Sequence, residues 1–70
     1  MSDYINNNVF LLRKKKNVTQ EQLAEYLGVS RQTIIAIEKG NYIPSLLLGL
    51  KIARYFKKNV EDIFQYKYEK

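Results

Sequence analysis

The sequence predicts an all-α domain of five helices, closed by a short two-stranded antiparallel ribbon that joins the two ends. Apolar residues recur at helical spacing in segments separated by turn residues such as Gly28 and Gly40. Aromatic and polar residues alternate near the C-terminus, which is the period of a strand. Because a lone strand is not stable, residues 65–69 are expected to pair with residues 3–5. The alternative is a frayed tail.

The ends of the predicted helices are indicated by residues with clear capping preferences. Thr19 and Gln22 form the pattern of a capping box. Gly28 ends that helix, because glycine enters the left-handed conformation at low cost. Ser30 and Ser45 are the expected caps of the third and fourth helices. The five predicted helices span residues 7–16, 19–27, 30–39, 45–56 and 60–64.

The composition limits the chain to one small domain, residues 1–70, and excludes several kinds of site. Without cysteine or histidine, disulfides, thiol chemistry and the usual zinc sites are excluded, so no metal or cofactor is expected. Neither paired catalytic carboxylates nor a glycine-rich phosphate loop occurs, so an enzyme is the least expected class. The chain also lacks a membrane-spanning apolar run and a signal-peptide pattern, so a cytoplasmic protein with no membrane partner is expected.

Residues 19–40, TQEQLAEYLGVSRQTIIAIEKG, predict two short helices joined by a tight turn. The second helix would bury Ile34 and Ile37 and expose the small and polar residues 30–33 on its first turn. Such side chains are suited to reading base edges, whereas a plain helical hairpin would not need them. The net charge of +5 favours a polyanion as partner, although many small domains are mildly basic. The segment therefore predicts a helix-turn-helix that binds double-stranded DNA.

A longer pattern surrounds this segment. LLRKKKN precedes it, and LKIARYF and VEDIF follow it. Over residues 5–64 the chain resembles the lambda/434-type repressor and Cro (Xre-like) family of helix-turn-helix proteins. Within that family it is most similar to small stand-alone bacterial regulators such as the cytolysin repressor. The resemblance implies five helices, a short antiparallel sheet after them, and a recognition helix at residues 30–39.

The resemblance also implies roles for individual residues. The positions that match base-reading residues are Arg31, Gln32, Thr33, Ile35 and Ala36. The positions that match phosphate-binding residues are Gln20, Ser30, Lys39, Asn41, Tyr42 and Ser45. Arg31 can make bidentate hydrogen bonds to guanine, and Gln32 can make them to adenine. Phosphate contacts instead fix the register of the protein on the DNA without reading its sequence. Ala36 replaces the long side chain common in the family, so contact there would be steric or with a thymine methyl group. Ile35 replaces a polar residue, and it either touches a methyl group in the groove or is simply an exposed apolar residue.

Two further positions bear on structure rather than on readout. Arg13 and Glu38 match a pair that bridges the first helix to the end of the recognition helix. If the pair is well buried, loss of one partner would cost about 3–5 kcal/mol. If it is exposed, it is worth under about 1 kcal/mol. Lys57 stands where a helix-ending glycine is common in the family, which leaves open a different turn after the fourth helix.

Apolar residues such as Phe10 exceed what so small a core can hold, so some apolar surface is expected to be left over. Residues 59–70, above all Ile63, Phe64 and Tyr66, are the predicted interface of a homodimer. The alternative is that Ile63 and Phe64 cap the core of the monomer. A twofold dimer would set two recognition helices about 34 Å apart, on successive major grooves of a palindromic operator.

The predicted function is therefore a nucleoid-associated transcriptional regulator. A dimeric repressor on an inverted-repeat operator is the first hypothesis, and repression follows from the resemblance alone. An antitoxin that also binds a toxin is one alternative, which co-purification with a small partner chain would favour. A protein-binding module that has lost DNA readout is another, but the polar opening of the recognition helix argues against it.

Overall fold

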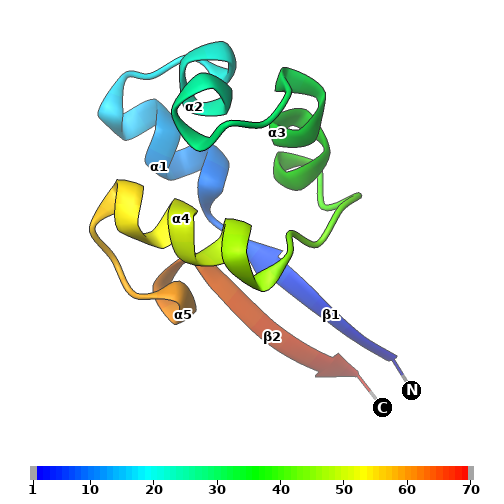
Figure 1. The fold of residues 1–70 in the computed structure, drawn as a ribbon. Coiled ribbons are helices and arrows are strands. Elements are labelled where there is room, and N and C mark those ends of the chain that lie inside the picture. Colours follow the sequence, from blue (N-terminus) through cyan, green and yellow to red (C-terminus); the bar gives the residue numbers. More distant parts are fainter. Residues whose placement is uncertain (1, 70) are drawn as a thin grey trace.

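Five helices lie between two terminal strands in the computed structural model, which describes residues 2–69 (Figure 1). Met1 and Lys70, the ends of the predicted domain, lie outside the described residues. The elements in chain order are β1 (Ser2–Asn7), α1 (Val9–Lys16), α2 (Gln20–Leu27), α3 (Arg31–Glu38), α4 (Leu46–Phe56), α5 (Val60–Ile63) and β2 (Phe64–Glu69). The predicted fold is thus confirmed, both in its five helices and in the ribbon that joins the two ends.

The helix ends form as their capping residues predict. The Thr19 hydroxyl accepts the backbone N–H of Gln22 at 3.0 Å, and the Gln22 side chain accepts the backbone N–H of Thr19 at 2.9 Å. This reciprocal pair is the predicted capping box, and it fixes the start of α2. Gly28 ends α2 in the left-handed conformation with φ 76°. Ser45 caps α4 by accepting the backbone N–H of Leu48 at 3.1 Å.

The turn after α4 keeps the left-handed form that glycine usually supplies. Lys57 adopts φ 57°, and its backbone N–H donates to the carbonyl of Arg54 at 3.2 Å. The next residue, Lys58, donates to the carbonyl of Ala53 at 3.0 Å. The unusual residue therefore does not change the turn. Instead, a side chain with a Cβ adopts a conformation that costs roughly 1–2 kcal/mol.

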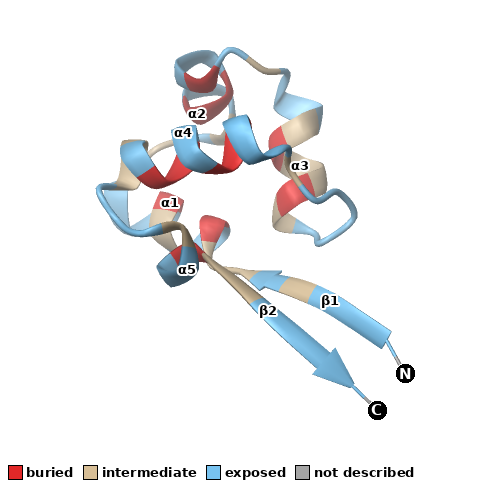
Figure 2. Ribbon diagram, turned by 60° about the horizontal axis from the view of Figure 1, so that its bottom comes forward, coloured by how far each residue is buried: buried red, intermediate tan, exposed pale blue. Residues whose placement is uncertain are grey.

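A single apolar core lies between the helices, and their buried stretches face one another (Figure 2). Its fully buried or nearly buried residues are Val9, Leu23, Ala24, Leu27, Ile34, Ile37, Leu48, Ile52, Ala53 and Ile63. Within α3 the spacing of Ile34 and Ile37 places both side chains on the inner face, as predicted, and both are 0% exposed. This packing sets which face of α3 remains outside. None of the helices within residues 2–69 is long and apolar enough to cross a bilayer.

The terminal ribbon is longer than predicted. β1 and β2 pair antiparallel over residues 2–7 and 64–69, with Ile5 opposite Tyr66. Phe64, expected at the end of the last helix, already belongs to β2. Asn7, expected in the first helix, ends β1, and its side-chain oxygen accepts the backbone N–H of Val9 at 3.1 Å. The helix α1 therefore begins two residues later than predicted, and the ribbon extends away from the helices (Figures 1 and 2).

Candidate nucleic-acid interface

The start of α3 presents polar side chains to solvent. The Ser30 hydroxyl accepts the backbone N–H of Thr33 at 3.2 Å, which caps the helix at the predicted residue. Arg31 and Gln32 follow, and both are exposed. The other three predicted base-reading residues, Thr33, Ile35 and Ala36, are half-buried. The exposed polar first turn therefore belongs to a helix whose opposite face is anchored in the core.

The other end of α3 is held by a buried ion pair. The Arg13 Nε lies 2.6 Å from Oε2 of Glu38, and the Arg13 Nη2 donates to Oε1 of the same carboxylate at 3.1 Å. The side chains of the two residues are 8% and 6% exposed. Arg13 also donates from Nη1 to the carbonyl of Val18 at 2.9 Å. Of the two predicted alternatives, the buried pair is the one present, and it ties α1 to the end of α3.

Gln20 connects the two ends of α3. Its side-chain Nε2 donates to Glu38 Oε1 at 3.1 Å, and its Oε1 accepts from Arg31 Nε at 3.4 Å. Four side chains thus form a chain from Arg13 through Glu38 and Gln20 to Arg31. An amide nitrogen has two donors, so Gln20 keeps a second N–H for another acceptor. Sequence reasoning assigned Gln20 to phosphate binding and missed its bond to Glu38.

The remaining predicted phosphate-binding residues are all exposed. They are Ser30, Lys39, Asn41, Tyr42 and Ser45. The loop after α3 is held in shape by Gly40, at φ 79°, and by the backbone N–H of Asn41, which donates to the carbonyl of Ala36 at 2.9 Å. Ser30 and Ser45 both act as caps, so each hydroxyl oxygen already accepts a backbone N–H. The Ser30 hydroxyl also lies 3.1 Å from the hydroxyl oxygen of Thr33, so one of these two hydroxyls donates to the other. Ser45 would meet a phosphate oxygen through its O–H.

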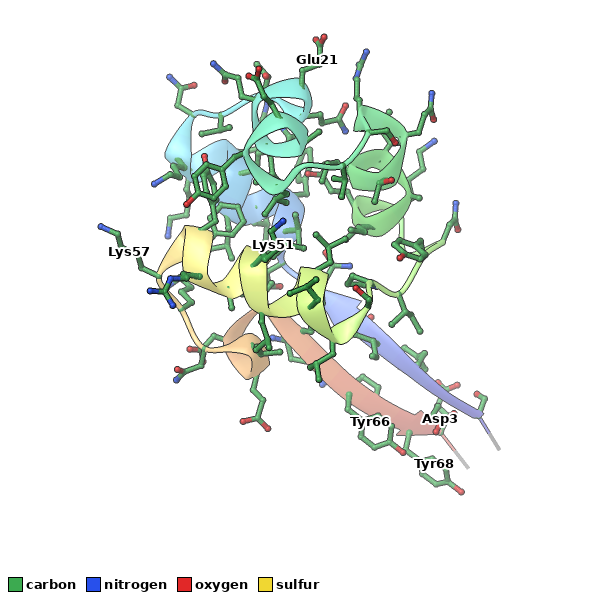
Figure 3. The ribbon with its side chains drawn as sticks, in the orientation of Figure 1. Asp3, Glu21, Lys51, Lys57, Tyr66 and Tyr68 are labelled. Atoms are coloured by element: carbon green, nitrogen blue, oxygen red, sulfur yellow. The ribbon has the colours of Figure 1, made fainter. Side chains whose placement is uncertain are left out.

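Much of the positive charge lies away from α3. Lys57 points outward at the far end of α4, on the opposite side of the molecule from α3 (Figure 3). Arg54, Lys57 and Lys58 line an open hollow there together with Asp62. Within α3 itself Arg31 is the cationic residue, and Lys39 follows directly after the helix. Net charge therefore favours a polyanion without locating where it binds.

The structure corrects part of the predicted dimer interface. Ile63 is 0% exposed and belongs to the core, so it has no side-chain surface to offer a second copy. Phe64 is half-buried against the same core, whereas Tyr66 is 67% exposed. Sequence reasoning also missed a small hollow in which Ile43 lies beside Ile5 and Tyr66. The loop before α4 thus extends the exposed apolar surface of the ribbon.

No group of three or more His, Cys, Asp or Glu residues that could hold a metal occurs within residues 2–69. The exposed polar groups at the two ends of α3 include the guanidinium of Arg31, the amide of Gln32 and the ammonium of Lys39. Glu21 and Glu25 line a hollow beside Arg31. Guanidinium, amide and ammonium groups donate hydrogen bonds to base edges and to phosphate oxygens.

Known proteins share both the sequence and the fold. A family model described as helix-turn-helix (HTH_3) matches residues 10–63. An uncharacterized HTH-type transcriptional regulator of Methanocaldococcus jannaschii is 60% identical over 60 residues, which cover 86% of this chain and 91% of that protein. The uncharacterized HTH-type transcriptional regulator YgzD of Bacillus subtilis is 53% identical over 58 residues, which cover 83% of this chain and 88% of that protein.

Among solved structures, the transcriptional regulator VanUg superposes with a TM-score of 0.76 at 24% sequence identity. The superposition covers 99% of this chain and 92% of that one, so it shares the arrangement of helices and ribbon. At this level of identity it supports the fold alone. The sequence matches carry the assignment further, and the protein belongs to the Cro/C1-type (Xre-like) helix-turn-helix family of DNA-binding transcriptional regulators.

Proposed function

We propose that the protein is a dimeric repressor that binds an inverted-repeat operator through α3. One observation supports this most: Arg31 and Gln32 are exposed at the start of a helix whose opposite face and far end are fixed. The buried side chains of Ile34 and Ile37 set the face, and the buried pair of Glu38 with Arg13 sets the end. A helix held in this way loses little further conformational entropy when it enters a major groove.

In this proposal Arg31 and Gln32 read bases. Arg31 presents a guanidinium that can donate two parallel bonds to the O6 and N7 atoms of guanine, and Gln32 an amide that matches adenine. Gln20 has a different role. It uses its second N–H on a phosphate while its oxygen holds Arg31, so that the position of the DNA backbone sets the position of a base-reading side chain.

The surface of the ribbon supports a second copy as the partner in the dimer. Ile5, Tyr66 and Ile43 lie together around one hollow, and the neighbouring start of α4 adds Leu46 and Leu47, which are 76% and 70% exposed. So much exposed apolar side chain on a chain this small marks an interaction surface. A two-stranded ribbon is also marginal by itself, and a second copy packed on it would stabilise both.

A twofold axis through this surface would place two α3 helices on successive major grooves, about 34 Å apart. Occupation of such a site at a promoter would exclude RNA polymerase and lower transcription. The protein would then act in the cytoplasm, on the nucleoid. The relatives named as transcriptional regulators support regulation of this kind for the present chain.

The test is selection of bound duplexes from a random pool at about 0.15 M salt, with the mass in solution measured by light scattering. We expect an inverted repeat with half-sites about one helical turn apart, and the mass of a dimer. Salt-sensitive binding without enrichment would contradict base reading by Arg31 and Gln32. A monomer that enriches a single half-site would contradict the dimer alone. A second, co-purifying chain would favour the antitoxin function instead.

A further inference from the structure

An open hollow of about 340 Å³ lies beside the turn of the helix-turn-helix. Its walls come from the end of α2, from α3, from the loop after α3 and from the start of α4. Thr33, Tyr42 and Ser45 bring hydroxyl groups to it, and Lys51 brings an ammonium group. None of the described residues that line it is acidic. By contrast, Asp62 lines the hollow at the far end of α4.

Lys51 is held in the wall of this hollow by the end of α2. Its Nζ donates to the carbonyl oxygen of Leu27 at 2.7 Å and lies 3.9 Å from the position that a Cβ on Gly28 would occupy. The side chain rises from α4 towards α2 (Figure 3). A cation is favoured at this place, because the C-terminal end of a helix has partial negative charge. An ammonium group has three donors, and this bond uses one of them.

The hydroxyl groups around Lys51 come from residues next to the recognition helix. Thr33 belongs to the first turn of α3, and Tyr42 belongs to the loop that follows it. The Ser45 oxygen accepts the backbone N–H of Leu48, so its O–H remains a donor. The hollow thus combines a positive charge with hydroxyl groups, of which that of Thr33 also contacts Ser30 at 3.1 Å, and no competing carboxylate from the described residues. This combination suits a phosphate oxygen.

We propose that Lys51 is a further DNA-binding residue, which supplies the positive charge of a phosphate site in this hollow. The proposal rests on the proposed reading of DNA by α3, because a duplex in contact with α3 runs its backbone past the loop that contains Tyr42. One protomer would neutralise one backbone phosphate there. Since Lys51 also holds the carbonyl of Leu27, the same side chain would link the position of the backbone to the turn between α2 and α3.

The test is the salt dependence of binding to the selected operator by Lys51→Met, which keeps an unbranched apolar side chain slightly shorter than that of lysine and removes its charge. Each phosphate contact contributes about 0.9 to the slope of log K against log salt concentration. We expect the slope of the dimer to fall by about 1.8 and the affinity at about 0.15 M salt to fall on the order of tenfold. Base preference should not change.

Two control variants separate the possible explanations. Lys57→Met removes one charge at the far end of α4 and should leave the slope unchanged, whereas Lys51→Arg keeps the charge and should retain the wild-type slope. Lower affinity of Lys51→Met with an unchanged slope would mean that Lys51 only supports the turn, and would overturn the proposal. Inorganic phosphate added as a competitor separates two possible ligands. If Lys51→Met lowers the slope for duplex DNA while inorganic phosphate competes equally well with the wild type and the variant, the ligand is the DNA backbone. Failure of the wild-type protein to select any operator would instead contradict the proposed function.

Discussion

The two ends of α3 differ in almost every physical respect. At the C-terminal end of α3, the side chain of Glu38 is nearly buried and accepts hydrogen bonds from Arg13 and Gln20. At its start, Arg31 and Gln32 are exposed, and Arg31 makes one long contact of 3.4 Å with Gln20. The proposed function thus assigns orientation and readout to different residues of one short helix. A change of base preference at the start need not disturb the contacts that hold the helix.

The buried pair is better explained by orientation than by net stability. Removing two charges from water is costly, and well-packed apolar residues of similar size often stabilise a fold as much. What apolar residues cannot supply is the directional, two-pronged contact of a guanidinium with a carboxylate. Here that contact fixes α1 against the last turn of α3, and through Gln20 it reaches the side chain of Arg31.

The largest expected effect is at the fixed end. Glu38→Ala leaves the Arg13 guanidinium buried without its carboxylate, and we expect the free energy of unfolding to fall by about 3–5 kcal/mol. Urea denaturation followed by circular dichroism measures this loss. The double variant Arg13→Met with Glu38→Met is the control, because it removes both charges and should recover most of the stability. A loss under about 1 kcal/mol for Glu38→Ala would mean that the pair behaves as an exposed one.

A smaller effect, on binding alone, is expected at the exposed start. Arg31→Ala should weaken operator binding by roughly 1–3 kcal/mol and relax the preference at one base pair of each half-site. Its urea midpoint should match that of the wild type, because Arg31 is exposed. Binding to a panel of single-base operator variants measures the preference. Arg31→Lys keeps the positive charge but not the bidentate geometry of the guanidinium. It should therefore retain more of the affinity for DNA than of the preference for one base pair. An equal loss on every duplex would show that Arg31 contacts only phosphate.

Local features of the fold could be predicted from the sequence because they depend on neighbouring residues. The capping box at Thr19, the left-handed Gly28 and the cap at Ser30 each involve contacts within a few positions, and all three form as predicted. The stripe of Ile34 and Ile37 likewise predicted which face of α3 is buried. The pairing of Arg13 with Glu38 came from the family resemblance, since 25 residues separate them in sequence.

Features that depend on distant parts of the chain were harder to predict. The ribbon is longer than its alternation of residues indicated, because Asn7 and Phe64 pair at its base before the pattern begins. Ile63 is a similar case, because an apolar side chain is suited to an interface and to a core alike. The packing of α5 against the other helices buries Ile63 in the core. The bond between Gln20 and Glu38 requires α2 and α3 to be packed against each other.

The smallest expected effect concerns Ser30 and tests whether this residue only caps α3 or also contacts DNA. The Ser30 hydroxyl caps the helix, so Ser30→Ala should lower the free energy of unfolding by about 1 kcal/mol. In Ser30→Asp the carboxylate caps the helix as well as the serine hydroxyl does, and its negative charge is stabilised by the positive N-terminal end of the helix dipole. We therefore expect this variant to retain the stability of the wild type. Its carboxylate would nevertheless repel a nearby phosphate and weaken DNA binding. Urea denaturation and operator titration of both variants separate the two roles. If Ser30→Asp binds the operator as tightly as the wild type, Ser30 only caps α3, and the boundary between orientation and readout lies at Arg31.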